Sequence, residues 1–146
     1  MTPLLASVLV ALVALAPISK QQQDRWEEQV RRQLDRAADL LSNDHDYTLY
    51  REPTMGSLRA NASESQTVTM SGGKHYMILA VCDNDCSDID LRVYNEGGDM
   101  IGSDIEDDDT PIVQLNPSNT GRYRIRTTMA TCKVEPCRYG VGIYVR

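Results

Sequence analysis

The chain has 146 residues, 41% of them apolar, and a formal net charge of −6. This length is typical of one domain and leaves little room for two. The acidity argues against a nonspecific nucleic-acid binder, because such proteins need a basic surface to displace counterions from the phosphates.

The N-terminus has the pattern of a signal peptide. Residues 4–16 are apolar except for Ser7, which is the length of a hydrophobic signal region and short for a membrane span. Ala14 and Ala16 offer a small-residue cleavage site. We therefore predict a signal peptide over residues 1–19, whose exact cleavage point the pattern does not fix, and a periplasmic or secreted mature protein without a membrane span. The alternative is an uncleaved N-terminal anchor.

Residues 20–43 have the period of an amphipathic helix. Apolar side chains recur there at steps of three and four, and charged residues crowd the opposite face. The apolar stripe consists of Trp26, Val30, Leu34, Ala37 and Leu41. Such a helix either covers part of the following domain or joins a partner helix through its stripe. The stripe spans only about three heptads, which favours the covering role.

From residue 44 onward the sequence predicts strands, because short β-prone runs alternate with turn signals rich in Gly, Asn, Pro and Asp. At residues 76–81 both the odd and the even positions are apolar, as expected for a central strand covered on both faces. Residues 89–94 instead alternate between apolar and polar side chains. The other runs are 47–50, 66–70, 100–101, 112–115, 123–129 and 139–145. We predict a mainly β domain over residues 44–146, an antiparallel β-sandwich or jelly-roll-like fold, preceded by the one amphipathic helix.

The four cysteines form two close pairs, Cys82/Cys86 and Cys132/Cys137. An even count in an exported chain indicates disulfides, although the count allows three connectivities. We favour local pairing, in which each bond closes a short loop at a strand end and the second pair clamps the last hairpin. Each closure would contribute about 2 kcal/mol in the chain-entropy model. Zinc is the alternative, but the spacings are wider than the usual C-x₂-C and export favours oxidation.

A loop rich in carboxylates follows the apolar run and leads into the next strand. The candidate metal ligands in it are Asp83, Asp85, Asp88 and Asp90. Ca²⁺ takes oxygen ligands from closely spaced carboxylates and carbonyls in a turn, so Ca²⁺ is the candidate cofactor, although the spacing is not that of an EF-hand. The alternative is a solvated loop whose Asp side chains accept hydrogen bonds from nearby amides. Four like charges at close range repel unless something neutralises them, which keeps both interpretations open.

Two more charged stretches follow. Residues 104–109 are almost all acidic, and we interpret them as a solvated loop. Arg122, Arg124 and Arg126 alternate along one strand face, which makes them a candidate surface for an anionic partner such as a polysaccharide or phosphate. We favour the alternative that they pair across strands with acidic neighbours, at about a few tenths of a kcal/mol per contact.

The sequence lacks the usual residue groups of a hydrolase. Only His45 and His75 are present, no G-x-S-x-G elbow occurs, and oxidised thiols are not available as nucleophiles. The carboxylates cluster in one loop instead of facing each other across a cleft, as those of a glycosidase would. We therefore predict no catalytic residues and no enzymatic activity.

Three segments resemble the bacterial pre-peptidase C-terminal (PPC) domain family: residues 74–81, residues 85–94 with the turn at 95–99, and residues 120–125. In that family an Asp-rich segment leads into a D-L-x-L-Y-type strand, followed by a D-G-like turn and a late G-x-Y strand. The similarity covers residues 47–146. It implies a small jelly-roll-like sandwich, usually appended to secreted peptidases, some relatives of which bind calcium or extracellular polymers. Because no peptidase domain precedes it here, we expect a stand-alone exported member.

Together these patterns predict a non-enzymatic, exported binding or accessory module of the cell envelope or extracellular space. Its expected partner is an envelope or extracellular polymer or protein, and not a nucleic acid. Calcium bound at the Asp-rich loop would stabilise it. The alternative is a structural protein that assembles through its N-terminal helix.

Overall fold

The computed structural model describes residues 20–146, and the predicted signal peptide at residues 1–19 lies outside the described residues. One helix is followed by a series of strands. The elements are α1 (Lys20–His45), β1 (Thr48–Leu49), β2 (Thr54–Leu58), β3 (Ser63–Met70), β4 (Tyr76–Cys82), β5 (Cys86–Tyr94), β6 (Met100–Asp104), β7 (Ile112–Leu115), β8 (Gly121–Cys132) and β9 (Cys137–Val145). Within residues 20–146, no helix is both long enough and apolar enough to cross a membrane.

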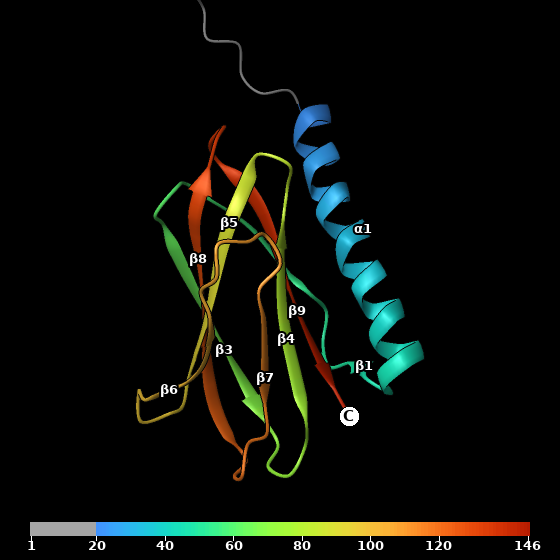
Figure 1. Ribbon diagram of the computed structural model, residues 1–146, viewed down its shortest axis with the longest axis vertical. Coiled ribbons are helices and arrows are strands. Elements are labelled where there is room, and N and C mark those ends of the chain that lie inside the picture. The colour runs from blue at the N-terminus through green and yellow to red at the C-terminus, as the bar shows by residue number, and fades with distance from the viewer. Residues whose placement is uncertain (1–19) are drawn as a thin grey trace, which may run out of the picture.

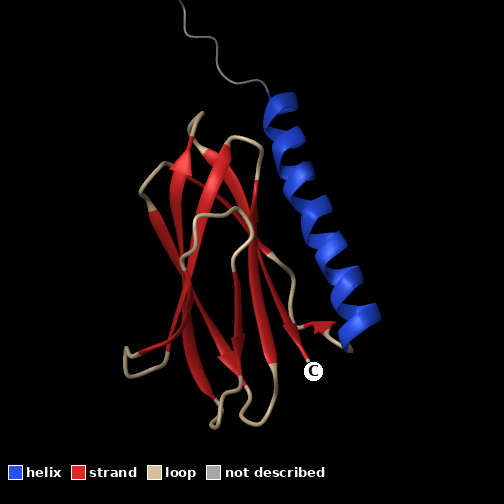
Figure 2. Ribbon diagram, in the orientation of Figure 1, coloured by secondary structure: helices blue, strands red, loops and turns tan. Residues whose placement is uncertain are grey.

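The strands form two antiparallel sheets packed face to face, with α1 along the outside of one of them (Figure 1, Figure 2). The five-stranded sheet has the order β1-β9-β4-β7, with β2 also paired to β9, and the four-stranded sheet has the order β3-β8-β5-β6. The chain therefore crosses repeatedly from one sheet to the other, and two of these crossings lie between β4 and β5 and between β8 and β9. The predicted mainly β antiparallel sandwich, preceded by one amphipathic helix, is confirmed.

The alternation in β5 decides which of its faces lies in the core. Ile89, Leu91 and Val93 are fully buried between the sheets, while the intervening Asp90 and Arg92 lie on the outer face. Side chains of a strand point alternately to opposite faces, so one register places every apolar residue inside. The outer face of the four-stranded sheet is thus polar.

The side chains on both faces of β4 are apolar because both faces are covered. Ile78 and Ala80 belong to the core between the sheets, whereas Leu79 and Val81 pack in a second cluster beneath the helix. The five-stranded sheet is consequently the middle layer of three, with the four-stranded sheet on one side and α1 on the other.

The apolar stripe of α1 packs against the five-stranded sheet. Val30, Leu34 and Leu41 are buried there, and the Tyr144 hydroxyl donates a hydrogen bond of 3.3 Å to the Leu34 carbonyl. The helix approaches closely because Gly140 has no side chain: a Cβ there would lie 2.7 Å from a Leu34 methyl carbon and 2.8 Å from one of Val30. The stripe is therefore used within the chain, as expected of a covering helix, and is not left free to pair with another helix.

Both disulfides lie where the chain passes from one sheet to the other. The bonds are Cys82–Cys86 and Cys132–Cys137, each with Cα atoms 5.9 Å apart. All four thiols are consumed, which leaves no thiolate for zinc. The expectation that the second pair clamps a hairpin is wrong, because β8 and β9 belong to different sheets and do not pair with each other. Since Cys86 lies opposite Cys132 in the β5–β8 register, the two sheet crossings are side by side at one end of the sandwich.

Candidate functional site

Asp83 holds the two sheet crossings together. Its side chain is 2% exposed, and its two carboxylate oxygens accept hydrogen bonds from the backbone N–H groups of Asp85 at 3.1 Å and Arg138 at 2.6 Å. The Asp83 N–H in turn donates to the Arg138 carbonyl at 3.0 Å. Burial raises the pKa of this carboxyl, and the hydrogen bonds from Arg138 and Asp85 offset part of that rise. Asp83 is thus committed to fixing the backbone of the corner.

Of the other three predicted metal ligands, Asp85 lies beside Asp83 in the same corner, whereas Asp88 and Asp90 lie on β5. Asp90 lies further along β5 and forms an ion pair of 3.0 Å with Arg92. Asp88 has a buried Oδ1 atom without a hydrogen-bond partner among the described residues. Its pKa is raised, mainly by burial and further by the charges of Asp90, Asp107 and Asp108.

Across residues 20–146, no group of three or more His, Cys, Asp or Glu side chains converges in a geometry suited to a metal ion. The four predicted ligands are instead divided between the sheet-crossing corner, where Asp83 and Asp85 lie, and the polar positions of β5, where Asp88 and Asp90 lie. Calcium binding by these residues stays a prediction.

The three arginines of β8 lie on the outer face of the four-stranded sheet, and their contacts differ. Arg122 forms a two-pronged ion pair with Glu96, through Nε at 3.0 Å and Nη2 at 2.7 Å. The guanidinium of Arg124 lies 4.3 Å from the ring centre of Tyr94. Arg126 donates a hydrogen bond of 3.2 Å to the Ser63 hydroxyl. Pairing with an acidic residue, which the sequence favoured for all three, is found only for Arg122 among the described ion pairs.

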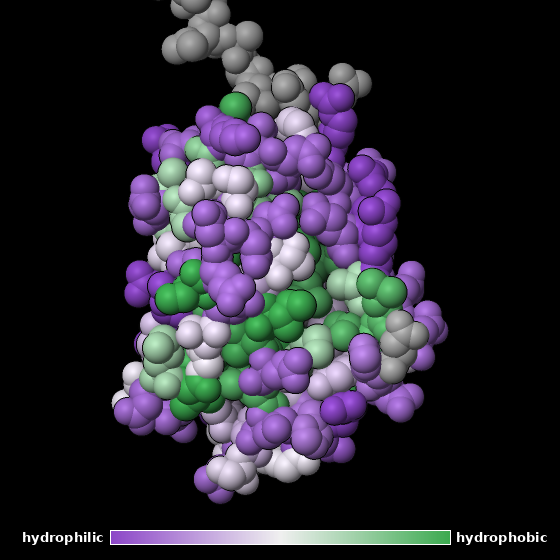
Figure 3. Space-filling model, in the orientation of Figure 1, coloured by the Kyte–Doolittle hydropathy of each residue, from purple (hydrophilic) through white to green (hydrophobic). Residues whose placement is uncertain are grey.

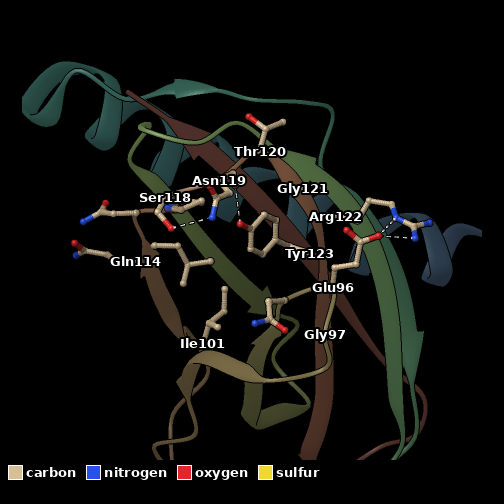
Figure 4. Close-up of a pocket in the computed structure, with 14 residues that line it drawn as sticks. Glu96, Gly97, Ile101, Gln114, Ser118, Asn119, Thr120, Gly121, Arg122 and Tyr123 are labelled. Carbon is tan, nitrogen blue, oxygen red and sulfur yellow. Dashed lines mark hydrogen bonds and ion pairs between the residues drawn. The ribbon is translucent and has the colours of Figure 1, made fainter.

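A groove of about 500 Å³ lies at the end of the sandwich opposite the disulfides (Figure 4). The turn after β5, the strand β6, the end of β7 and the loop before β8 form its walls. Ile101, Gln114 and Tyr123 lie around it in Figure 4, with the Arg122–Glu96 ion pair at one edge. The lining combines one exposed apolar side chain with amides, hydroxyls and one ion pair, which suits binding by shape and hydrogen bonds.

The loops that form this groove are held in place before any ligand binds. The Tyr123 hydroxyl donates to the Asn119 carbonyl at 2.9 Å, and the Gly73 N–H donates to the Pro117 carbonyl at 2.8 Å. In the turn after β5, Asn95 bonds to Asp99 through both backbone and side chain, while Gly98 has the positive φ of 91° that favours glycine. A preorganised groove loses less conformational entropy when a partner binds.

An apolar surface adjoins the groove along the open side of the sandwich. β6 and β7 are the terminal strands of their sheets and lie in contact. Figure 3 shows apolar surface over these two strands, bordered by polar residues. The exposed apolar residues there, with their exposed fractions, are Met100 (57%), Ile101 (40%), Ile105 (56%) and Ile112 (44%). We call this surface the β6/β7 edge.

The β6/β7 edge is bordered by the acidic loop between its two strands. Asp104 tethers that loop by accepting a hydrogen bond of 2.8 Å from the Ile112 N–H. Glu106 and Asp107 are exposed and form no ion pair with a described residue. The apolar surface therefore has a negative margin.

Neither the groove nor the β6/β7 edge was predicted from the sequence. A signal was present, since Met100-Ile101 and Ile112-Val113 are adjacent apolar pairs on short strands, and only one residue of each pair can face the core. The identity of the two terminal strands, however, depends on sheet order, which the local sequence does not specify.

No protein-family model matches the chain, and no curated protein matches it either. Among solved structures, the chain is similar to the crystal structure of Aeromonas hydrophila PliG, a periplasmic lysozyme inhibitor of g-type lysozyme. The TM-score is 0.50 and the sequence identity 14%, over 65% of this chain and 85% of that chain. At this identity the similarity shows a shared fold. The resemblance to the PPC family stays a prediction.

Proposed function

We propose that this chain is an exported, non-enzymatic protein that binds a basic protein partner through the groove and the β6/β7 edge. The exposed apolar side chains on two neighbouring terminal strands are the observation that carries the proposal. Contiguous apolar surface rimmed by polar residues is typical of protein interaction sites. The signal-peptide pattern and the two disulfides support export.

Burial of these side chains would provide a useful share of binding energy. Full burial of an Ile or Met side chain is worth about 1.5–3 kcal/mol, so a half-exposed one has about 1 kcal/mol left to gain. Terminal strands also present unpaired backbone N–H and C=O groups, which an extended partner segment can satisfy by strand addition.

The acidic margin selects the charge of the partner. Glu106 and Asp107 would favour a partner with a positive surface, because complementary charge speeds association and disfavours acidic competitors. The shared fold makes a g-type lysozyme the first partner to test, since PliG inhibits that class of enzyme.

The test measures binding of the full chain to purified g-type lysozyme, together with lysozyme activity on bacterial cell walls. We expect binding that weakens with added salt and inhibition in the same concentration range. The double variant Met100→Gln/Ile112→Gln should bind about thirtyfold more weakly, since it removes two contributions of about 1 kcal/mol each.

The matched control is Leu40→Gln/Val134→Gln, which removes two apolar side chains of similar exposure, 62% and 63%, on the helix and in the β8–β9 loop. This control should bind as the wild type does. If the Leu40→Gln/Val134→Gln control binds as weakly as the Met100→Gln/Ile112→Gln variant, the assignment of binding to the β6/β7 edge is refuted. Absence of both binding and inhibition would remove lysozyme as the partner.

A further inference from the structure

The outer face of the four-stranded sheet carries positive charge on a protein whose net charge is −6. Arg122, Arg124 and Arg126 alternate with the buried Tyr123 and Ile125, so their side chains share this face. The helix covers the other sheet and leaves this face open (Figure 1). The described part of the chain therefore presents a row of arginines to the surroundings.

Two of these arginines lack a neutralising partner. Arg122 is paired with Glu96, and Arg92 on the adjacent strand is paired with Asp90. Arg124 and Arg126 form no ion pair with any residue whose side chain the structure describes, residues 25–43 and 45–146. The contacts of Arg124 with the Tyr94 ring and of Arg126 with the Ser63 hydroxyl orient the guanidinium groups without cancelling their charge.

The register adds to the electrostatic cost of this face. Arg126 lies directly opposite Arg92 in the β5–β8 ladder. Like charges directly opposite each other across antiparallel strands are destabilising. An anionic group bound over the face would relieve that repulsion, so the native arrangement favours a bound anion.

A hollow of about 400 Å³ continues the face toward the turn after β5. Thr67, Arg122 and Arg124 line it, and Glu96 occupies its edge. Glu96 is 60% exposed, so an anionic group of a ligand can compete with it for Arg122. When a ligand displaces Glu96, Arg122 becomes available as a third arginine for binding the ligand.

We propose that this face, formed by Arg122, Arg124 and Arg126 with Tyr94, binds an acidic polysaccharide. Alternate residues of a strand are about 6.8 Å apart, so the row matches a polymer with widely spaced anionic groups. Duplex DNA has one charge per about 1.7 Å of axis, which the net acidity of the whole chain would repel. This face shares Arg122 and Glu96 with the protein-binding groove, whereas Arg124 and Arg126 line neither that groove nor the β6/β7 edge.

The test measures binding of the full chain to immobilised polygalacturonate and dextran sulfate, which distinguish carboxylate from sulfate recognition. Neutral dextran and duplex DNA are the comparison polymers. We expect binding to at least one acidic polysaccharide, loss of that binding as salt rises, and no binding to dextran. Absence of binding to both acidic polysaccharides at low salt, or tighter binding to DNA, would overturn the proposal.

Variants assign the binding to this face. Arg124→Gln/Arg126→Gln should weaken it about tenfold, since each exposed ionic contact contributes up to about 1 kcal/mol. Arg124→Lys/Arg126→Lys should retain most of it, and thermal melts verify that both variants fold. Glu96→Gln frees Arg122 and should tighten binding about two- to fivefold. Arg32→Gln/Arg36→Gln, which removes the same two charges from the helix over the other sheet, should have no effect. Unchanged binding by the double Gln variant would refute the assignment.

Discussion

Replacement of Asp83 by Ala tests how the sheet-crossing corner is stabilised. The substitution removes the acceptors for the N–H groups of Asp85 and Arg138, which are bonded to the carboxylate at 3.1 and 2.6 Å. A buried donor left without a partner costs about 1–3 kcal/mol, so two such donors cost about 2–6 kcal/mol. Burial disfavours the charged carboxylate and raises the pKa of Asp83, so removing it returns part of that cost.

We therefore expect Asp83→Ala to lower the free energy of unfolding by about 2–3 kcal/mol, a large share of the 5–15 kcal/mol typical of a domain. Asp83→Asn keeps the shape but only one acceptor oxygen, so its loss should be about half as large. The assay is urea unfolding at pH 7, followed by circular dichroism. The control is Asp85→Ala, because the Asp85 side chain has no hydrogen bond or ion pair with the side chains described at residues 25–43 and 45–146 or with the described backbone.

The same experiment, with calcium and then with chelator, separates the structural role of Asp83 from metal binding. A backbone-fixing role predicts the same loss in both conditions. A loss that vanishes in chelator would identify Asp83 as a calcium ligand and refute our interpretation. A loss below about 1 kcal/mol, or equal to that of Asp85→Ala, would refute the stabilising role itself.

Three further predictions follow from particular contacts. Cys132→Ala/Cys137→Ala should cost about 2 kcal/mol in urea unfolding, because the bond closes a short loop, and no loss would contradict the chain-entropy argument. Asp88 has a raised pKa in the folded state, so the stability it contributes is fully present below its unfolded pKa and is lost as pH rises through the folded pKa. Asp88→Asn should therefore raise the Tm at pH 7 and leave it unchanged near pH 3, and a Tm lowered at pH 7 would contradict this sign. Gly140→Val places methyl groups against Leu34 and Val30 and should cost about 1–3 kcal/mol by thermal melt, whereas Gly97→Val in the exposed turn should cost less.

The calcium and PPC interpretations need tests of their own. A Tm that rises with calcium concentration would show that the ion binds the native state preferentially, whichever residues hold it. An unchanged Tm would leave the acidic residues as a solvated margin of the sandwich. Calcium-dependent stabilisation would also agree with what the PPC resemblance implies.

The sequence by itself determined most of the elements and their buried faces, although the predicted strands do not include β2. The alternation of Ile89, Leu91 and Val93 fixed the inward face of β5, because a shift of one residue would expose all three. The apolar side chains on both faces of β4 predicted that both faces are covered. The short apolar stripe of the helix predicted that the helix covers one of these faces. These are local patterns, so no knowledge of the chain's path was needed.

Only the tertiary structure decided which strands are neighbours, and this placed every candidate site. The sequence predicted a hairpin of β8 and β9, yet the two strands lie in different sheets. The disulfide between them therefore fixes a sheet crossing. The pairing of β5 with β8 brought Arg126 opposite Arg92, and the terminal positions of β6 and β7 left their apolar residues exposed. Strand order depends on contacts between residues far apart in the chain, whereas periodicity reports only the two faces of each strand.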